Sequence, residues 1–133
     1  MRDTSPVMER RRISGTSPYE PIMGYCRAVV AGNMVYVAGT APIPPDGSPP
    51  PDGSYEQTKL CLEIVGRALD QAGASFEDVV RTRISIADRA HFEGVARAHG
   101  EVFADIRPVN TTVVTALMDP RWTVEIDVDA VVP

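Results

Sequence analysis

Three acidic residues near the C-terminal end of the chain are the first candidates for chemistry. Glu125, Asp127 and Asp129 occupy every second position in a run of otherwise mostly apolar residues. This alternation is typical of a strand with one face in the core, so the three carboxylates share the opposite face. The ordinary interpretation is a solvated face, or pairing across the sheet with Arg81 and Arg83. If that face lies in a subunit cleft, desolvation would raise the pKa of Glu125 and let it position or deprotonate a water molecule.

The histidines and cysteines are weaker candidates for a catalytic or metal site. The sequence contains no Gly-rich phosphate loop and no CxxC, HExxH or GxSxG motif. His99 falls on the apolar side of an expected helix, where a packed structural histidine is favoured, and we expect His91, in the first turn, to be solvated. Cys61 is expected in the core, whereas Cys26 follows Tyr25 at a strand entrance, where a reactive thiol is an alternative. We predict no metal site, because further ligands cannot be assembled.

Length and charge narrow the classes of protein to consider. The 133 residues fit a single domain, placed at 1–133, and suffice to bury a core without disulfides. Eighteen acidic residues against thirteen basic ones give a net charge of −5, which disfavours a nucleic-acid partner or an anionic membrane surface. No apolar run approaches the roughly 20 residues of a membrane span, and the N-terminus lacks the apolar middle of a signal peptide. With two cysteines we expect free thiols and a cytoplasmic protein.

The N-terminal third predicts strands separated by turns. Residues 1–7 are polar, and we expect them to be flexible. A short strand is expected at 9–14, followed by a turn-rich stretch at 15–24. Two β-rich runs within 28–39 then flank Gly32-Asn33, a pair that tolerates positive φ and therefore suits a two-residue hairpin turn.

A proline-rich loop and a helix come next. Residues 41–53 contain six prolines and the pentapeptide PPDGS begins twice in them, which favours a surface loop; a ligand for a partner domain is the alternative. Ser54 and Gln57 have the spacing of a capping box at the start of a helix, and Gly73 is placed to end it. The apolar stripe that this helix would bury comprises Cys61, Ile64, Val65, Ala68, Leu69 and Ala72.

The C-terminal half predicts a strand, a helix and two more strands. The run 79–87 alternates, with Val80, Thr82, Ile84 and Ile86 on the expected inner side. Asp88 is placed to cap a second helix, which Arg107-Pro108 ends. The apolar stripe of this helix would comprise Phe92, Val95, Ala96, His99 and Phe103. Strands are then expected at 111–117 and 122–131.

The resulting element order is βββαβαββ, which predicts an α+β fold. Each helix is long enough to act as a crossover, so a two-layer sandwich with a mixed sheet and two helices on one face is expected. The other sheet face would be uncovered and partly apolar, so we expect copies of the chain to pack there. Its expected members are Val29 or Val30, Tyr36, Thr112, Val114 and Glu125.

Three segments together resemble one known family. They are GYCRAVVAGNMVYVAGTAP at 24–42, the stretch 55–88 containing AGASFEDVV, and RPVNTTVV followed by WTVEIDVDAV in 107–131. The chain resembles the Rid family, also called YjgF and formerly L-PSP endoribonuclease-like, from about residue 12 onward. The resemblance implies a chorismate-mutase-like fold and a homotrimer with clefts at its subunit interfaces. It also implies hydrolysis of reactive enamines and imines to ketoacids and ammonia, without metal or cofactor.

The resemblance carries over to site residues only in part. Tyr25 matches the family's cleft tyrosine, Gly39 matches the glycine whose backbone N–H faces the substrate, and Glu125 matches the glutamate that places the attacking water. Asn110 stands where the family has the arginine that clamps the substrate carboxylate. Thr112 stands where it usually has a cysteine. The chain therefore resembles a divergent branch that lacks the substrate-binding arginine.

Losing that arginine changes the substrates to consider. A bidentate guanidinium–carboxylate pair contributes on the order of 1.5–3 kcal/mol, and asparagine supplies a hydrogen bond but no charge. Arg27, Arg107 or Arg121 would have to supply a cation from another direction, and the sequence places none of them in the cleft.

Two main hypotheses follow. The first is an enamine or imine hydrolase acting on a substrate other than 2-aminoacrylate, in which Tyr25 orients the substrate, Gly39 polarises it and Glu125 handles water. Asn110 and Thr112 would then donate hydrogen bonds to the substrate. The second is a non-catalytic trimer that binds a metabolite or regulates a partner through the same cleft. A ribonuclease is disfavoured, because a basic stripe and a suitable histidine pair are lacking.

Overall fold

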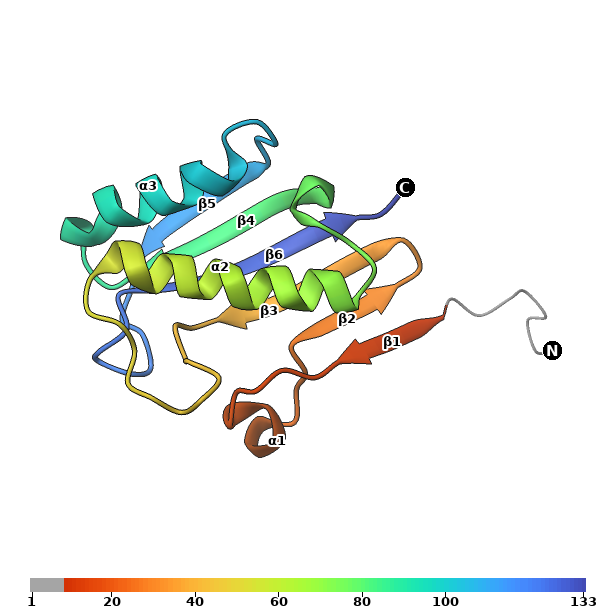
Figure 1. Ribbon diagram of the computed structural model, residues 1–133, viewed down its shortest axis with the longest axis horizontal. Coiled ribbons are helices and arrows are strands. Elements are labelled where there is room, and N and C mark those ends of the chain that lie inside the picture. Colours follow the sequence, from red (N-terminus) through yellow and green to blue (C-terminus); the bar gives the residue numbers. More distant parts are fainter. Residues whose placement is uncertain (1–8) are drawn as a thin grey trace.

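The computed structural model describes residues 9–133, and the flexibility expected for 1–7 lies outside this range. Within it, two long helices cover one face of a six-stranded sheet (Figure 1). The strands are β1 Arg10–Ile13, β2 Ala28–Ala31, β3 Met34–Thr40, β4 Val79–Ile86, β5 Val109–Val114 and β6 Val124–Val131. The helices are α1 Tyr19–Met23, α2 Ser54–Gln71 and α3 Phe92–Phe103, with single 3₁₀ turns at Phe76–Asp78 and Arg89–His91. None of the described helices is long and apolar enough to cross a membrane.

The sheet is mixed, and its strand order is β1-β2-β3-β6-β4-β5. Only β4 and β5 run parallel among these neighbours, and α3 forms the crossover between them. The last strand, β6, pairs antiparallel with both β3 and β4 and so lies in the middle of the sheet. The predicted α+β sandwich and its order of strands and long helices are confirmed, with α1 added.

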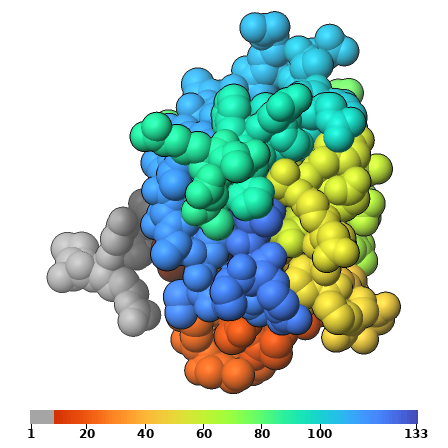
Figure 2. All heavy atoms as spheres, turned by 90° about the vertical axis from the view of Figure 1, so that its left-hand side faces the viewer, coloured from red at the N-terminus to blue at the C-terminus, as the bar shows by residue number. Residues whose placement is uncertain are grey.

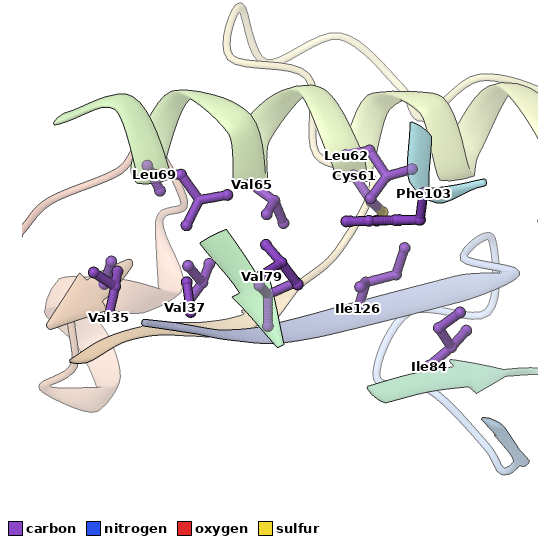
Figure 3. Packing of buried hydrophobic residues seen from close by; sticks show 14 of the residues in the cluster. Val35, Val37, Cys61, Leu62, Val65, Leu69, Val79, Ile84, Phe103 and Ile126 are labelled. Atoms are coloured by element: carbon purple, nitrogen blue, oxygen red, sulfur yellow. The ribbon is translucent and has the colours of Figure 1, made fainter. Parts of the chain in front are cut away.

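The core lies between α2 and the helix-facing side of the sheet. Figure 3 shows Cys61, Val65 and Leu69 pointing from α2 toward Val37 and Ile126 on the strands beneath. The predicted stripe of α2 is confirmed apart from Ile64, which is only half-buried. Burial of this stripe removes apolar surface from water and fixes α2 across β3 and β6.

The predicted end of α2 is confirmed and the helix begins at Ser54 as expected, but the predicted capping box is wrong. Gly73 has φ +82 and follows the helix in a Schellman arrangement, in which its N–H and that of Ala74 bond carbonyls of the last turn. At the start no side chain caps the helix, and Gly53 holds the cap position. Gln57 is buried instead: its amide donates to the carbonyls of Pro51 and Arg121. The cross-chain bonds of Gln57 therefore replace the expected capping box.

The predicted core-facing side of β4 is wrong at the first two residues of the strand. Val79 is 3% exposed and Val80 is 45% exposed. The pairing of β4 with β6 shifts register between Val79 and Arg81, so an extra residue interrupts the alternation there. From Thr82 onward the predicted alternation is confirmed.

The predicted stripe of α3 is partly wrong. Val95 and Phe103 are buried, but Phe92 and Ala96 are exposed, and Ala98 is buried in place of Ala96. Because α3 lies over the β5 edge of the sheet (Figure 1), a narrower stripe meets the core than the sequence pattern indicates. The predicted capping residue, Asp88, caps the 3₁₀ turn that leads into α3, where its carboxylate accepts the N–H of Ala90.

The uncovered face also differs from expectation at its β5 edge. Thr112 pairs with Ile84 and Val114 with Ile86, so both point to the helix side of the sheet, not to the uncovered face. Predicted ion pairing on the uncovered face is confirmed. Arg83 contacts Asp127 and Asp129, and Arg81 lies 3.9 Å from Asp129.

The stretch 15–24, expected to be rich in turns, also forms the short helix α1. Pro18 precedes this helix and Pro21 lies in its first turn, where a missing N–H breaks no helical bond. Gly24 ends the helix with φ +78. The helix carries Glu20, whose side chain is buried.

Candidate functional site

A cavity of about 450 Å³ lies where α1, the end of β3 and the segment before β6 meet. Figure 2 shows the corresponding end of the molecule, where the proline-rich loop (yellow) and the residues between β5 and β6 (blue) lie side by side above the segment that contains α1 (orange). The polar lining of the cavity includes Tyr25, Arg27, Gly39 and Glu125. Its apolar lining includes Ile43, Ile64, Met118 and Trp122. Three of the predicted site residues therefore share one cavity.

Gly39 makes room for the Glu125 carboxylate. A Cβ added at position 39 would overlap the Oε1 atom of Glu125, so a larger residue would displace the carboxylate. The pairing of β3 with β6 shifts register between Val37 and Thr40, which places Gly39 in an irregular stretch of strand. Such irregularities re-aim backbone and side chains beside functional sites. The sequence thus sets Gly39 and Glu125 in contact across neighbouring strands.

Arg27 forms part of the cavity wall and is held by several acceptors. It is 4% exposed, and its Nη1 donates to the Gly39 carbonyl at 2.8 Å and to the Thr40 hydroxyl at 2.9 Å. Its Nη2 donates to the Tyr25 hydroxyl oxygen at 3.3 Å. Since this oxygen accepts from Arg27, the O–H of Tyr25 is not used in that bond and can donate to a ligand. Arg27 therefore orients both the backbone of Gly39 and the Tyr25 phenol.

Glu20 supplies the buried counter-charge for Arg27. One carboxylate oxygen accepts the N–H of Gly15 at 2.8 Å, and the other lies 3.4 Å from Arg27 Nε. Both side chains are about 5% exposed, so water does not screen the pair. The Oε2 atom of Glu20 makes no hydrogen bond among the described residues, so the ion pair is its main compensation.

Glu125 is the carboxylate of this cavity that is suited to proton transfer. Burial raises its pKa above the ordinary value, nearby Arg27 opposes that rise, and Asp127 adds to it. A carboxylate with a raised pKa is a better base toward water and can also return a proton to a leaving group. The side chain is half-buried, so it can reach a ligand in the cavity.

Asn110 and Thr112 do not reach this cavity within one chain. The Asn110 amide donates to the Thr82 hydroxyl at 3.0 Å, and its oxygen accepts from Thr112 at 2.8 Å. The Thr82 hydroxyl also lies 2.9 Å from His99 Nε2, and burial lowers the pKa of His99. These groups form a polar chain between β5, β4 and α3. The substrate-binding roles expected for Asn110 and Thr112 stay predictions that need a second subunit.

Among the described residues, the cysteines and carboxylates show no further reactive cluster. Cys61 is fully buried, and burial raises the pKa of its thiol, as expected for a core cysteine. Cys26 is half-buried, and its thiol donates to the Ala28 carbonyl at 3.4 Å. Within residues 9–133, no group of three or more histidine, cysteine, aspartate or glutamate side chains is arranged to hold a metal ion.

Sequence reasoning did not assign roles to three residues at this site. Arg27 shares a side with Tyr25 because the two are separated by one position at a strand entrance, and that spacing was the available signal. Trp122 begins the alternating C-terminal run and packs edge-on to Tyr19, with ring centroids 6.4 Å apart. Glu20 lay in a stretch read as turns, so its burial had no local signal.

The family model described as Endoribonuclease L-PSP matches residues 15–132. The chain is 39% identical over 121 residues to an uncharacterised protein from Streptomyces coelicolor, with 90% of each chain covered. It is 32% identical over 113 residues to 3-aminoacrylate deaminase RutC from Acinetobacter baylyi, covering 84% of this chain and 88% of that protein.

Solved structures agree with this match. A crystal structure of a YjgF-family protein from Mycobacterium tuberculosis superposes with a TM-score of 0.84 at 42% identity, covering 93% of this chain and all of that one. A protein of unknown function from the Rid family of Yersinia pestis, YyfA, gives 0.83 at 27% identity with the same coverage. The sequence, the strand order, the family model, the relatives and the solved structures agree, and the chain belongs to the Endoribonuclease L-PSP family, the Rid/YjgF proteins.

Proposed function

We propose that the protein hydrolyses a small imine or enamine other than 2-aminoacrylate, with Glu125 and Tyr25 as its catalytic residues. The observation that carries this proposal is the half-buried Glu125 carboxylate, which shares a cavity with the Tyr25 phenol and has a raised pKa. The relative from Acinetobacter baylyi is named as a deaminase, which supports hydrolytic release of ammonia as the reaction class.

The proposed reaction converts an imine and water into a carbonyl compound and ammonia. Glu125 takes a proton from water while the water oxygen bonds to the imine carbon, and it passes this proton to the nitrogen to give a neutral carbinolamine. Glu125 then takes the proton of the new hydroxyl as the carbonyl forms and delivers it to the nitrogen as the C–N bond breaks, so that ammonia leaves and the carboxylate is regenerated. Tyr25 and the backbone N–H of Gly39 orient the substrate and stabilise charge that develops during attack. No metal or cofactor takes part in these steps.

We propose that the working site lies at a subunit interface of a homotrimer. Val109 and Val113 on β5 are 58% and 49% exposed, and their pairing with Arg81 and Ser85 puts them on the uncovered sheet face. Exposed apolar side chains on one face favour packing of copies there. In such an assembly, β5 of one subunit would bring its Asn110 and Thr112 to the cavity of a neighbouring subunit. The free thiols and net charge of −5 fit a cytoplasmic protein without nucleic-acid or membrane partners.

Ammonia release tests the proposed hydrolysis. An amino-acid oxidase would generate 2-iminopropionate, and an amine oxidase would generate alkyl imines that lack a carboxylate, in the presence and absence of the protein. We expect faster ammonia release from the imines without a carboxylate, with 2-iminopropionate as a poor substrate because Asn110 replaces arginine. Glu125→Ala should lose the acceleration, whereas Glu63→Ala, an exposed glutamate on α2, should retain it. Spontaneous rates with every imine would contradict the proposal.

The second candidate is a non-catalytic trimer that binds a small metabolite. The commitment of the Asn110 amide to Thr82 favours it, because that amide is then not presented to a substrate. Stabilisation of the protein by a ligand that is recovered unchanged would support this candidate. We do not propose ribonuclease activity: the described cavity lining contains no histidine, and His99 is bonded to Thr82.

A further inference from the structure

We propose that the cavity selects ligands whose nitrogen is protonated, such as iminium or ammonium groups, and rejects carboxylates. This inference rests on the proposed use of the cavity as the ligand site and adds the charge class of the ligand. The balance of charges around the cavity and its apolar walls support this preference.

The one basic residue in the described cavity lining is already neutralised. Arg27 lies 3.4 Å from Glu20 through Nε, and both side chains are buried. Its Nη1 is occupied by the Gly39 carbonyl and the Thr40 hydroxyl. A ligand carboxylate would have to compete with Glu20 for this guanidinium, and the second carboxylate would then lie buried without compensation. Arg27 therefore holds the wall together and does not offer an uncompensated positive charge.

Glu125 is the remaining charged group of the cavity lining, and no described ion pair involves it. The neighbouring Asp127 is paired with Arg83 on the uncovered face. Arg121, which directly precedes the lining residue Trp122, is paired with Asp119 at 2.8 Å. With Glu125 ionised, the cavity carries one unbalanced negative charge. A carboxylate ligand would be repelled, whereas a protonated nitrogen would form a charge-assisted hydrogen bond with Glu125.

The walls indicate what accompanies the charged nitrogen. Ile43, Ile64, Met118 and Trp122 line the cavity, and Trp122 is 6% exposed. A volume of about 450 Å³ accommodates a ligand with a body the size of a six-membered ring. Burial of such a body against these side chains is favourable, so the ligand class is a protonated imine or amine with an apolar substituent.

Three matched probes test the charge preference on the protein as it assembles in solution. Benzylamine, benzyl alcohol and benzoate share one apolar ring and carry a positive, a neutral and a negative group at pH 7. Their affinities are measured by calorimetry or by competition. We expect benzylamine to bind at least tenfold more tightly than benzyl alcohol, and benzoate to bind most weakly.

Two variants and a control test whether Glu125 and the Glu20–Arg27 pair cause the preference for benzylamine. Glu125→Gln should remove the advantage of benzylamine over benzyl alcohol, while Asp70→Asn, which removes an exposed carboxylate from α2, should leave it intact. Glu20→Gln leaves Arg27 uncompensated and should shift the order toward benzoate, provided that the variant remains folded. If Glu20→Gln does not fold, Glu125→Gln alone decides the source of the preference.

Failure of this inference differs from failure of the proposed hydrolysis. The charge preference is overturned if benzoate binds as tightly as benzylamine or more tightly, if benzylamine and benzyl alcohol bind equally, or if no probe binds. Tight binding of benzoate counts against the proposal even when a partner subunit supplies the cation that binds it. If benzylamine is preferred but no imine is hydrolysed, the cavity is a binding site for cations and the hydrolase proposal falls. If 2-iminopropionate is hydrolysed faster than imines that lack a carboxylate, the hydrolase proposal stands in altered form and the charge preference falls.

Discussion

The ionised Glu125 side chain lowers the stability of the folded protein at neutral pH. Its folded pKa lies above the ordinary value of 4.5, so the folded state holds the proton more tightly than the unfolded state does. The contribution of Glu125 to stability is therefore complete below pH 4.5 and is lost as the pH rises through the folded pKa. We expect Glu125→Gln to raise the melting temperature at pH 7 and to have a smaller effect at pH 4.

Thermal unfolding of both proteins from pH 4 to pH 8 measures this difference. Asp70→Asn is the control, because it removes an exposed carboxylate from α2 and should change the melting temperature little at either pH. A lower melting temperature of Glu125→Gln at pH 7 would show that Glu125 stabilises the fold through its charge, contrary to the prediction. Loss of activity together with gained stability is the expected pattern for a residue kept for function.

The Glu20–Arg27 pair predicts an opposite result at the same cavity. Glu20→Gln keeps the hydrogen bond that Gly15 donates to the Oε1 position but leaves the Arg27 charge buried without a partner. Breaking such a pair costs about 3–5 kcal/mol of unfolding free energy. Asp119→Asn breaks an ion pair whose arginine is 61% exposed and screened by solvent, so it should cost much less than Glu20→Gln. Urea unfolding that gives similar losses for the two variants would contradict the buried pair's role.

At the level of single residues, the sequence predicted part of the site. Glu125 was identifiable because a regular alternation fixes the face of every residue in the last strand. The role of Arg27 was not, because its partner Glu20 comes from a five-residue helix with no periodicity of its own. The bonds of Asn110 to Thr82 were also hidden, since they depend on the parallel register of β4 and β5.

The end of α2 gives a prediction at the scale of the element. Gly73 has φ +82, a conformation that costs an L-residue roughly 1–2 kcal/mol, so Gly73→Ala should lower the unfolding free energy by about that amount. Gly100 lies inside α3 with open space where a Cβ would project, so Gly100→Ala should be neutral or stabilise by up to about 1 kcal/mol. Denaturant unfolding compares the two glycines directly. Equal effects of the two substitutions would show that the positive φ at position 73 does not require glycine.

The same element shows why some local signals misled. Ser54 and Gln57 have capping-box spacing, but Gln57 is 3% exposed and bonds to Pro51, Arg121 and Thr123. A buried amide has to satisfy its donors and acceptor, and partners distant in sequence won over the local cap. The reversal at Val79 and Val80 has a similar origin, because a bulge depends on pairing with a distant strand. The order and type of the long elements were predictable from the sequence. Which side chain caps a helix, and which residue beside a bulge faces the core, were not.

Assembly is the prediction at the scale of the whole molecule. The uncovered face carries two kinds of side chain: the ion-paired Arg83, Asp127 and Asp129, and the exposed valines Val109 and Val113 at its β5 edge. The ion pairs leave little net charge to repel a second copy, and the valines gain from leaving water. We expect the purified chain to sediment as a trimer, measured by analytical ultracentrifugation.

A charge at Val113 tests whether this face makes the trimer. Val113→Asp puts a carboxylate on the uncovered face beside Ser85, and burying it in an interface without a partner would be strongly unfavourable. We expect the variant to sediment as a monomer with unchanged far-UV circular dichroism. Ile22→Asp, at a residue of α1 that is 76% exposed, should remain trimeric. If the site is completed by a second subunit, Val113→Asp should also lose the ligand affinity that Ile22→Asp retains; a monomer with full affinity would place the whole site within one chain.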